Sequence, residues 1–200
     1  MLSAVSPPTS RELPVRVDFI RHGKTEGNLE MRYVGRTDEP LSFSGIAELM
    51  KTDYPPCGVL ITSPMKRCIQ TAELIYPGKA PIICEELREC DFGAFEGRNY
   101  IELSTDSRYQ KWIDSGGESA FPEGEAPADF KERCVAGFLA SIAKVPEGSS
   151  ATFVVHGGTI MAILERFAQP HQDYYHWQVT NGHGFITEFD GEKITVTEKI

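Results

Sequence analysis

Residues 15–23 read VRVDFIRHG, and residues 151–158 read ATFVVHGG. Each stretch opens with a β-branched and aromatic apolar run that is typical of a buried strand, and each ends in a His-Gly pair. The carboxyl ends of parallel strands share one edge of a sheet, where ligands bind in open α/β folds. The two stretches therefore predict that His22 and His156 lie at the same edge.

The remaining pattern alternates strands with helices. We expect further strands at 59–62 and 81–84, helices at 42–51, from Ser63, at 130–142 and at 159–167, a broken helix at 100–113, a surface loop at 115–127, and a hairpin of 185–189 with 193–197 around Asp190-Gly191. This order predicts an α/β three-layer sandwich, with a mostly parallel central sheet, an antiparallel edge, and helices on both faces. Residues 1–14 are predicted to be a flexible tail and residues 15–200 a single domain.

Composition narrows the classes of partner. The 200 residues carry a formal net charge of −9, which disfavours nucleic acid and anionic membranes. Because no apolar run approaches the ~20 residues of a membrane span, and no basic and apolar leader opens the chain, a cytoplasmic protein is expected. The five cysteines are scattered without a CxxC pair, so they are predicted to be small buried hydrophobes rather than disulfides or zinc ligands.

A third strand end predicts an anion site. In ITSPMKRCIQTAE, residues 61–73, Ser63 is a candidate helix cap and Arg67 falls in the first helical turn. A helix N-terminus attracts anions, and a guanidinium matches phosphate oxygens with two parallel hydrogen bonds. With Arg21 and the two histidines nearby, we expect a phosphate-binding pocket.

Four blocks of sequence resemble a known family. They are RHGKTEGN (21–28), SPMKRCIQTAE (63–73), LRECDFGAFEG (87–97) and VVHGGT (154–159), and in this order they resemble the signature blocks of the histidine phosphatase (phosphoglycerate mutase-like) superfamily. RYVGRTDEPLSFSG (32–45) is similar to the loop that follows the first block in the phosphatase branch. The resemblance covers nearly the whole chain from Val15.

The resemblance implies a role for each matched residue. His22 would be the nucleophile, Glu89 the general acid, and Arg21, Arg67 and His156 the groups that bind the phosphoryl group, with Asn28 and, more weakly, Thr25 adding contacts, and Gly23 and Gly157 allowing close backbone approach. A protonated His156 and the two arginines could supply the positive charge, so no metal or cofactor is expected. On the residues alone, Glu85, Glu86, Asp91 and Glu96 compete with Glu89, and only the resemblance selects it.

The resemblance favours a phosphatase that acts on a small phosphate ester, as a monomer or a homodimer. GRTDEPLS and LRECDFGAFEG look most like α-ribazole-5′-phosphate phosphatases, whereas the mutases carry an ERHYG-type stretch where this chain has ECDFG. A phosphoglycerate mutase, an inactive phosphoester-binding module, and a metallohydrolase using His22, His156 and carboxylates remain alternatives. His171, His176 and His183 lie outside the matched blocks and are predicted to be surface or structural residues.

Overall fold

The computed structural model describes residues 14–200, so all of the predicted tail except Pro14 lies outside the described residues. Its centre is a six-stranded sheet in the order β3-β2-β4-β1-β5-β6. The strands are β1 (Val15–Arg21), β2 (Val59–Thr62), β3 (Ile82–Ile83), β4 (Ala151–Val155), β5 (Gly184–Phe189) and β6 (Ile194–Lys199). β3, β2, β4 and β1 run parallel, while β5 and β6 continue the sheet antiparallel. The predicted sheet and its antiparallel edge are confirmed.

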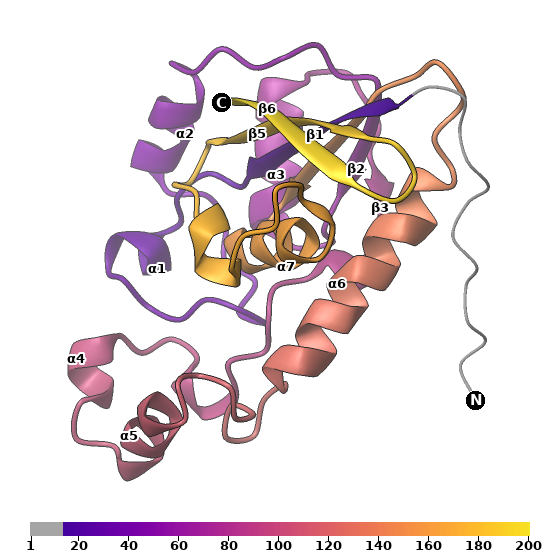
Figure 1. The fold of residues 1–200 in the computed structure, drawn as a ribbon. Coiled ribbons are helices and arrows are strands. Elements are labelled where there is room, and N and C mark those ends of the chain that lie inside the picture. The colour runs from indigo at the N-terminus through magenta and orange to yellow at the C-terminus, as the bar shows by residue number, and fades with distance from the viewer. Residues whose placement is uncertain (1–13) are drawn as a thin grey trace.

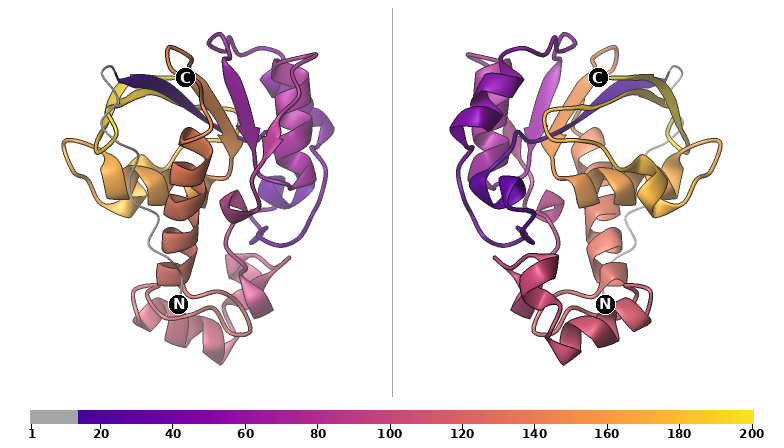
Figure 2. Two further views of the ribbon diagram at one scale, coloured as in Figure 1. Left: turned by 90° about the vertical axis from the view of Figure 1, so that its right-hand side faces the viewer. Right: turned by 90° about the vertical axis from the view of Figure 1, so that its left-hand side faces the viewer.

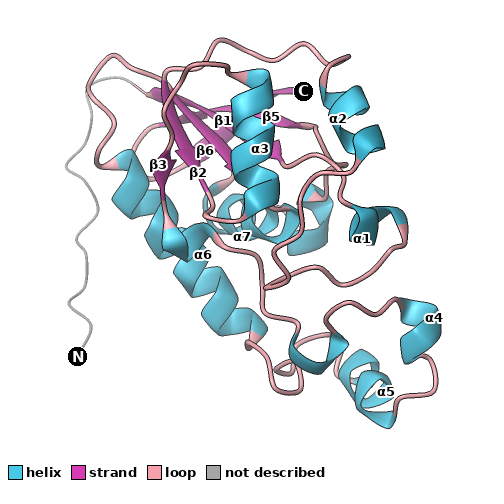
Figure 3. Cartoon of the chain, turned by 180° about the vertical axis from the view of Figure 1, so that it is seen from behind, coloured by secondary structure: helices cyan, strands magenta, loops and turns pink. Residues whose placement is uncertain are grey.

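Helices cover both faces of this sheet, as Figures 1 and 2 show. On one face α6 (Pro127–Ile142) and α7 (Gly157–Phe167) pack on Phe19 and Phe153, and their contact forms the main core. On the other face α3 (Lys66–Ile75) lies on Ile20 and Val154, and α2 (Phe43–Leu49) packs against α3. Figure 3 shows α3 in front of the strands. Because β4 is buried on both faces, its sequence is almost continuously apolar, whereas β1 also contains the buried Asp18, which pairs with Arg16.

A smaller unit of short helices extends from one end of the sheet. It holds α4 (Tyr100–Leu103) and α5 (Ser107–Asp114), which Figure 1 shows apart from the sheet layers. Leu103 of α4 and the partly buried Tyr109 and Trp112 of α5 join Phe95, Phe121 and Phe130 in a second core. The short helices α1 (Glu26–Leu29), η1 (Glu85–Leu87), η2 (Gly93–Phe95) and η3 (Tyr174–Trp177) complete the chain. The broken helix predicted at 100–113 is therefore confirmed as α4 and α5.

The expected start of α3 was wrong, and one short helix was not expected. α3 begins at Lys66 rather than at Ser63, and its N-cap residue, Met65, makes no side-chain cap hydrogen bond. α1 was not expected. It forms because the side chain of Thr25 accepts a hydrogen bond from the backbone N–H of Asn28, while the side chain of Asn28 accepts one from the backbone N–H of Thr25.

Candidate active site

The register of the parallel strands brings the two histidines together. Arg21 of β1 pairs with Val155 of β4, and the N–H of His22 donates to the carbonyl oxygen of Val155 at 2.9 Å. The next residue on each strand is therefore a histidine, and the ring centroids of His22 and His156 are 5.2 Å apart. Both side chains are buried.

His22 presents one ring nitrogen for nucleophilic attack. Its Nδ1 lies 2.7 Å from the carbonyl oxygen of Gly23, which can only accept, so Nδ1 carries the proton. The lone pair is then on Nε2. Burial lowers the pKa of His22 well below its usual value, and the positive charges of Arg67 and Arg21 lower it further. His22 is consequently a neutral imidazole, which is the form that attacks phosphorus.

His156 is also neutral in the free protein, while its protonation during phosphoryl transfer stays a prediction. Burial lowers its pKa well below the usual value, with Arg67 and the other nearby cations adding to the effect. Arg67 Nε donates to His156 Nδ1 at 3.3 Å, so Nε2 carries the proton and lies 2.8 Å from Ser63 Oγ. Ser63 thus orients His156 instead of capping α3. His156 is a neutral hydrogen-bond donor in the free protein, and the positive charge comes from the arginines.

The two arginines sit beside the histidines in different settings. Arg67 is fully buried and donates to the carbonyl oxygens of Thr37 at 2.7 Å and Gly35 at 2.8 Å. It therefore fastens the loop that follows the first block to the site. Arg21 donates from Nη1 to the carbonyl oxygen of Val179 at 2.7 Å, while its buried Nε has no hydrogen-bond partner among residues 14–200. A buried guanidinium N–H with no partner can donate to a phosphoryl oxygen.

Glu89 lies at the N-terminus of α7, opposite Arg21. Its Oε1 accepts from the N–H of Cys90 at 3.0 Å and its Oε2 from the N–H of Gly158 at 3.2 Å. Burial raises the pKa of Glu89, although the two N–H groups and the arginines act in the opposite direction. A raised pKa favours the protonated form that a general acid needs.

The other four carboxylates of this segment have partners elsewhere. Glu96 accepts from the N–H groups of Gly35 and Arg36, Asp91 accepts from the N–H of Gly93, Glu86 accepts from the thiol of Cys84, and Glu85 pairs with Arg88. Arg21 and Glu89 line the same cavity, and none of those four does. The structure thus supports Glu89 as the acid on geometric grounds that the residues alone did not supply.

Gly158 was missed by the sequence reasoning, which named its neighbour Gly157. A Cβ atom at Gly158 would stand 2.3 Å from Oε1 of Glu89 and 3.0 Å from Cζ of Phe130. The side chain of Glu89 can occupy its place only because residue 158 has none.

Gly158→Ala is expected to displace the Glu89 carboxyl and to lower kcat for unactivated esters on the order of 10²-fold. Alanine favours a helix over glycine, so the melting temperature should fall far less than the activity. Steady-state kinetics with an alkyl phosphate, together with a thermal melt, tests this. Wild-type kinetics in the folded variant would mean that this contact does not position the acid.

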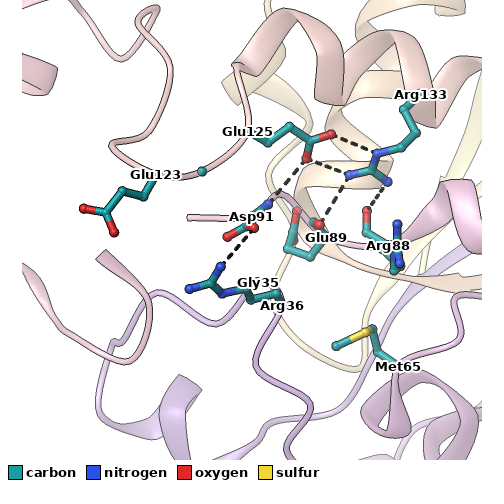
Figure 4. A pocket seen from close by; sticks show the side chains of 10 residues that line it. Gly35, Arg36, Met65, Arg88, Glu89, Asp91, Glu123, Glu125 and Arg133 are labelled. Carbon is teal, nitrogen blue, oxygen red and sulfur yellow. Dashed lines mark hydrogen bonds and ion pairs between the residues drawn. The ribbon is translucent and has the colours of Figure 1, made fainter. Parts of the chain in front are cut away.

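A partly buried ion pair holds the chain segment that carries Glu89, as Figure 4 shows. Arg133 of α6 donates to the carboxylate of Glu125 at 2.9 and 2.7 Å. The same guanidinium donates to the carbonyl oxygens of Glu86 at 2.7 Å, Arg88 at 3.0 Å and Glu89 at 3.4 Å. Arg133 thereby fixes the backbone on which the acid is mounted, and no motif in the sequence marks it.

Arg133→Lys keeps the positive charge but cannot reach several carbonyl groups with one planar fork. We expect kcat/KM for alkyl phosphates to fall about tenfold or more, with a smaller loss in kcat/KM for p-nitrophenyl phosphate, because the carboxyl of Glu89 is misplaced while His22 is not. Arg166→Lys, at an exposed position of α7, is the matched control. Equal losses on both substrates would indicate a general loss of stability instead.

Asn28 and Thr25, the two further phosphate contacts expected from the sequence, have different surroundings. The side-chain oxygen of Asn28 accepts from Asn181 Nδ2 at 3.1 Å, which leaves its NH₂ group to donate to a phosphoryl oxygen. The hydroxyl of Thr25 donates to Glu39 at 2.6 Å and caps α1, so the structure gives it a structural partner, and its phosphate contact stays a prediction.

The two glycines expected to allow close approach have different neighbours. A Cβ at Gly157 would lie 3.2 Å from Arg21 Nε, and one at Gly23 would meet Leu49. Gly157 accommodates Arg21, and Gly23 serves the packing of α2.

The three remaining histidines lie outside this site, whereas Cys68 Sγ lies 3.6 Å from His156 Nε2 and the N–H of Cys90 donates to Glu89. His171, His176 and His183 are exposed, and His183 lies 3.0 Å from the carbonyl oxygen of Ile200. All five cysteines are free and four are buried, but Cys57 is only partly buried, contrary to the expectation for it.

Within residues 14–200, no three His, Cys, Asp or Glu side chains are grouped as a metal ion would require. The metallohydrolase alternative therefore has no ligand set in the described part of the chain. None of the described helices combines the length and the apolar character needed to span a bilayer.

A cavity of about 590 Å³ is lined by Arg21, Glu89, Gly157 and Gly158, whereas His22, Arg67 and His156 are not among its lining residues. It is also lined by aromatic side chains from α5, α6, η3 and the loops on either side of the α4–α5 unit, and we call Tyr33, Phe92, Trp112, Phe121, Phe130 and Tyr174 the aromatic wall. The wall reaches Gly158, whose carbonyl oxygen accepts from the hydroxyl of Tyr174 at 3.3 Å. The cavity therefore joins Arg21 and Glu89 of the candidate site to aromatic surface.

Comparison with known proteins assigns the family. The model of the Histidine phosphatase superfamily (branch 1) matches residues 17–199, which is nearly the whole chain. The chain belongs to this superfamily, in agreement with the resemblance of the four sequence blocks.

Its relatives include proteins named as mutases. It is 31% identical over 160 residues to "Probable phosphoglycerate mutase GpmB" of Proteus mirabilis (strain HI4320), covering 75% of this chain and 73% of that protein. The protein of the same name from Enterobacter sp. (strain 638) is 33% identical over 155 residues and covers 72% and 70%.

Solved structures named as a phosphatase and as a mutase share the fold. The alpha-ribazole phosphatase from Shigella flexneri superposes with a TM-score of 0.80 at 22% identity, over 92% of this chain and 95% of that one. The phosphoglycerate mutase from Thermus thermophilus superposes with a TM-score of 0.71 at 28% identity, over 93% and 98%. The phosphoglycerate mutase-like fold is thereby confirmed.

Proposed function

We propose that this protein is a metal-independent phosphomonoester hydrolase of the cytoplasm that acts on a small phosphorylated metabolite through a phosphohistidine. The observation that carries the proposal is the pairing of a neutral His22, with its lone pair on Nε2, and a Glu89 whose pKa is raised. Phosphoryl transfer requires a nucleophile, a general acid and positive charge, which Arg21 and Arg67 supply here.

The reaction would proceed in two steps. Nε2 of His22 attacks phosphorus while the ester P–O bond breaks, and Glu89 gives its proton to the departing alkoxide. In the second step the Glu89 carboxylate takes a proton from water as the water oxygen attacks phosphorus and the N–P bond breaks. Inorganic phosphate leaves, and both His22 and Glu89 return to their starting forms. Arg21 and Arg67 supply the positive charge that opposes the charge on the phosphoryl oxygens.

A phosphoglycerate mutase is the second candidate, favoured by the names of the relatives described above. It would use the same first step and then return the phosphoryl group to a second substrate oxygen. Against it stands the ECDFG stretch, which lacks the basic residue of the ERHYG type. The inactive binding module is disfavoured, since Arg21, His22, Arg67, Glu89 and His156 are all present and assembled.

Phosphate release in EDTA tests the proposal. The panel holds p-nitrophenyl phosphate, α-ribazole 5′-phosphate, sugar phosphates, nucleotides and 3-phosphoglycerate. We propose α-ribazole 5′-phosphate as a candidate substrate on the resemblance of the 35–42 and 87–97 stretches. Hydrolysis in EDTA, without interconversion of 3- and 2-phosphoglycerate, supports a phosphatase. Interconversion in a primed mutase assay without phosphate release would assign the mutase instead.

A further inference from the structure

Building on the proposed function, we infer that the leaving group is an alcohol that bears a flat, uncharged aromatic ring, which the aromatic wall receives. The inference concerns the part of the 590 Å³ cavity beyond Glu89 and Arg21. Cavities of about 300–1,000 Å³ bind drug-sized molecules. A three-carbon leaving group such as glycerate would leave most of this cavity filled with water.

The aromatic wall is rigid and already assembled. Trp112 and Phe121 stack with ring centroids 4.9 Å apart, and Tyr33 meets Phe92 edge to face at 5.1 Å. Phe121 and Phe130 are buried. Rings that hold one another in place lose little further freedom when a ligand ring packs on them, so binding energy is retained.

The cations at this end are already neutralised by the protein itself. Arg32 binds Glu30 and, with both terminal nitrogens, Glu102 at 2.7 and 3.0 Å. Lys131 binds Glu165 at 2.7 Å and stands 4.5 Å from the centre of the Tyr174 ring. Each cation is therefore engaged by an internal partner before any ligand arrives.

The charge balance disfavours a second anionic group on the substrate. Glu118 also lines the cavity and is exposed, so the two cations at this end face four carboxylates. Apart from Arg21, which the transferred phosphoryl group would engage, the cations of the described lining are paired, so a leaving group with its own carboxylate or phosphate would meet carboxylates without a free cation to oppose them. A neutral ring carries no charge for these carboxylates to repel.

Phosphate esters of alcohols with similar pKa depart with similar ease. Comparison of their kcat/KM values therefore measures the preference for a ring alone. We expect kcat/KM for 2-phenylethyl phosphate to exceed that for propyl phosphate on the order of 50-fold, the gain from burying a ring in an apolar site. It should also exceed the values for 2-cyclohexylethyl phosphate, phosphocholine and 3-phosphoglycerate. Equal kcat/KM for the phenyl and propyl esters, or a preference for phosphocholine or 3-phosphoglycerate, would overturn the inference.

Substitutions of two residues that line the cavity locate the preference. Trp112→Leu should lower kcat/KM for the phenyl ester about tenfold and leave propyl phosphate unchanged, because only the ring uses this surface. Tyr175 lines the same cavity and is 66% exposed, so Tyr175→Ala gives a smaller loss in a variant that folds even if Trp112→Leu does not. Tyr100→Ala, a tyrosine 53% exposed on α4 and outside the lining, is the matched control. An unchanged preference for the phenyl ester in the folded variants of Trp112 and Tyr175 would contradict the inference.

Binding of phosphonates separates this inference from the proposed function. Calorimetry should show that 2-phenylethylphosphonate binds more tightly than propylphosphonate by a similar factor, even if no ester is hydrolysed. Absence of turnover together with this order of affinities would remove the hydrolase and keep the ring site. Hydrolysis by His22 with equal affinities would remove the ring site and keep the hydrolase.

Discussion

Replacement of His22 by alanine is expected to lower kcat/KM for every phosphate ester by on the order of 10⁴-fold or more. The imidazole supplies the nitrogen of the new N–P bond. Among the described residues, the other buried, neutral histidine beside it is His156, whose Nδ1 accepts from Arg67 and whose Nε2 bonds to Ser63. His156 therefore has no free nitrogen with which to replace His22. Steady-state phosphate release measures the loss.

The control for this prediction is His176→Ala, because His176 is an exposed histidine away from the site. It should keep wild-type activity. Circular dichroism and a thermal melt should show that both variants fold. Turnover near the wild-type rate in folded His22→Ala would remove His22 from the role of nucleophile.

Replacement of Glu89 by glutamine is expected to slow alkyl phosphates about 10²–10⁴-fold, the usual share of a general acid. The loss for p-nitrophenyl phosphate should be much smaller, because nitrophenolate departs without a proton. Comparison of kcat/KM for the two esters measures this difference, because kcat/KM reports the step in which the alcohol departs and not the later attack of water that Glu89 also assists. Glu85→Gln is the matched control, since Glu85 is exposed and pairs with Arg88 at the surface. Similar losses on both esters would count against Glu89 as the acid.

The pH profile gives an independent measure of the same group. Because burial raises the pKa of Glu89, its protonated fraction persists above the range of ordinary carboxyl groups and falls as the pH rises through that pKa. Activity on alkyl phosphates should therefore decline on the alkaline side, and Glu89→Gln should remove this decline. His22, with its depressed pKa, remains neutral as the pH falls below the ordinary histidine value of 6.5, so no loss is expected there from the nucleophile.

The fold follows largely from local sequence. The apolar runs at 15–20 and 151–155 predict buried strands, and the parallel register that places Arg21 beside Val155 then explains why His22 and His156 meet. The start of α3 could not be predicted, because Ser63 serves His156 rather than the helix. That choice depends on a contact between residues 93 positions apart in the chain.

The chemistry of the site follows less completely from the sequence. Five acidic residues lie between 85 and 96, and only tertiary contacts show that Glu89 alone among them shares a cavity with Arg21. The lowered pKa of His156 in the free protein comes from burial and from nearby cations, and neither can be seen in the local sequence. Gly158 and Arg133 act through space on Glu89, so no local pattern could have identified them.

Trapping the phosphorylated enzyme tests the central claim most directly. The protein is mixed with p-nitrophenyl phosphate, quenched rapidly in alkali, digested, and analysed by mass spectrometry. A phosphoramidate is stable in alkali and labile in acid, so we predict one phosphoryl group on the peptide that carries His22, lost after acid treatment and absent from His22→Ala. Phosphate release at the wild-type rate, with no phosphoryl group on His22 at any quench time, would contradict the account.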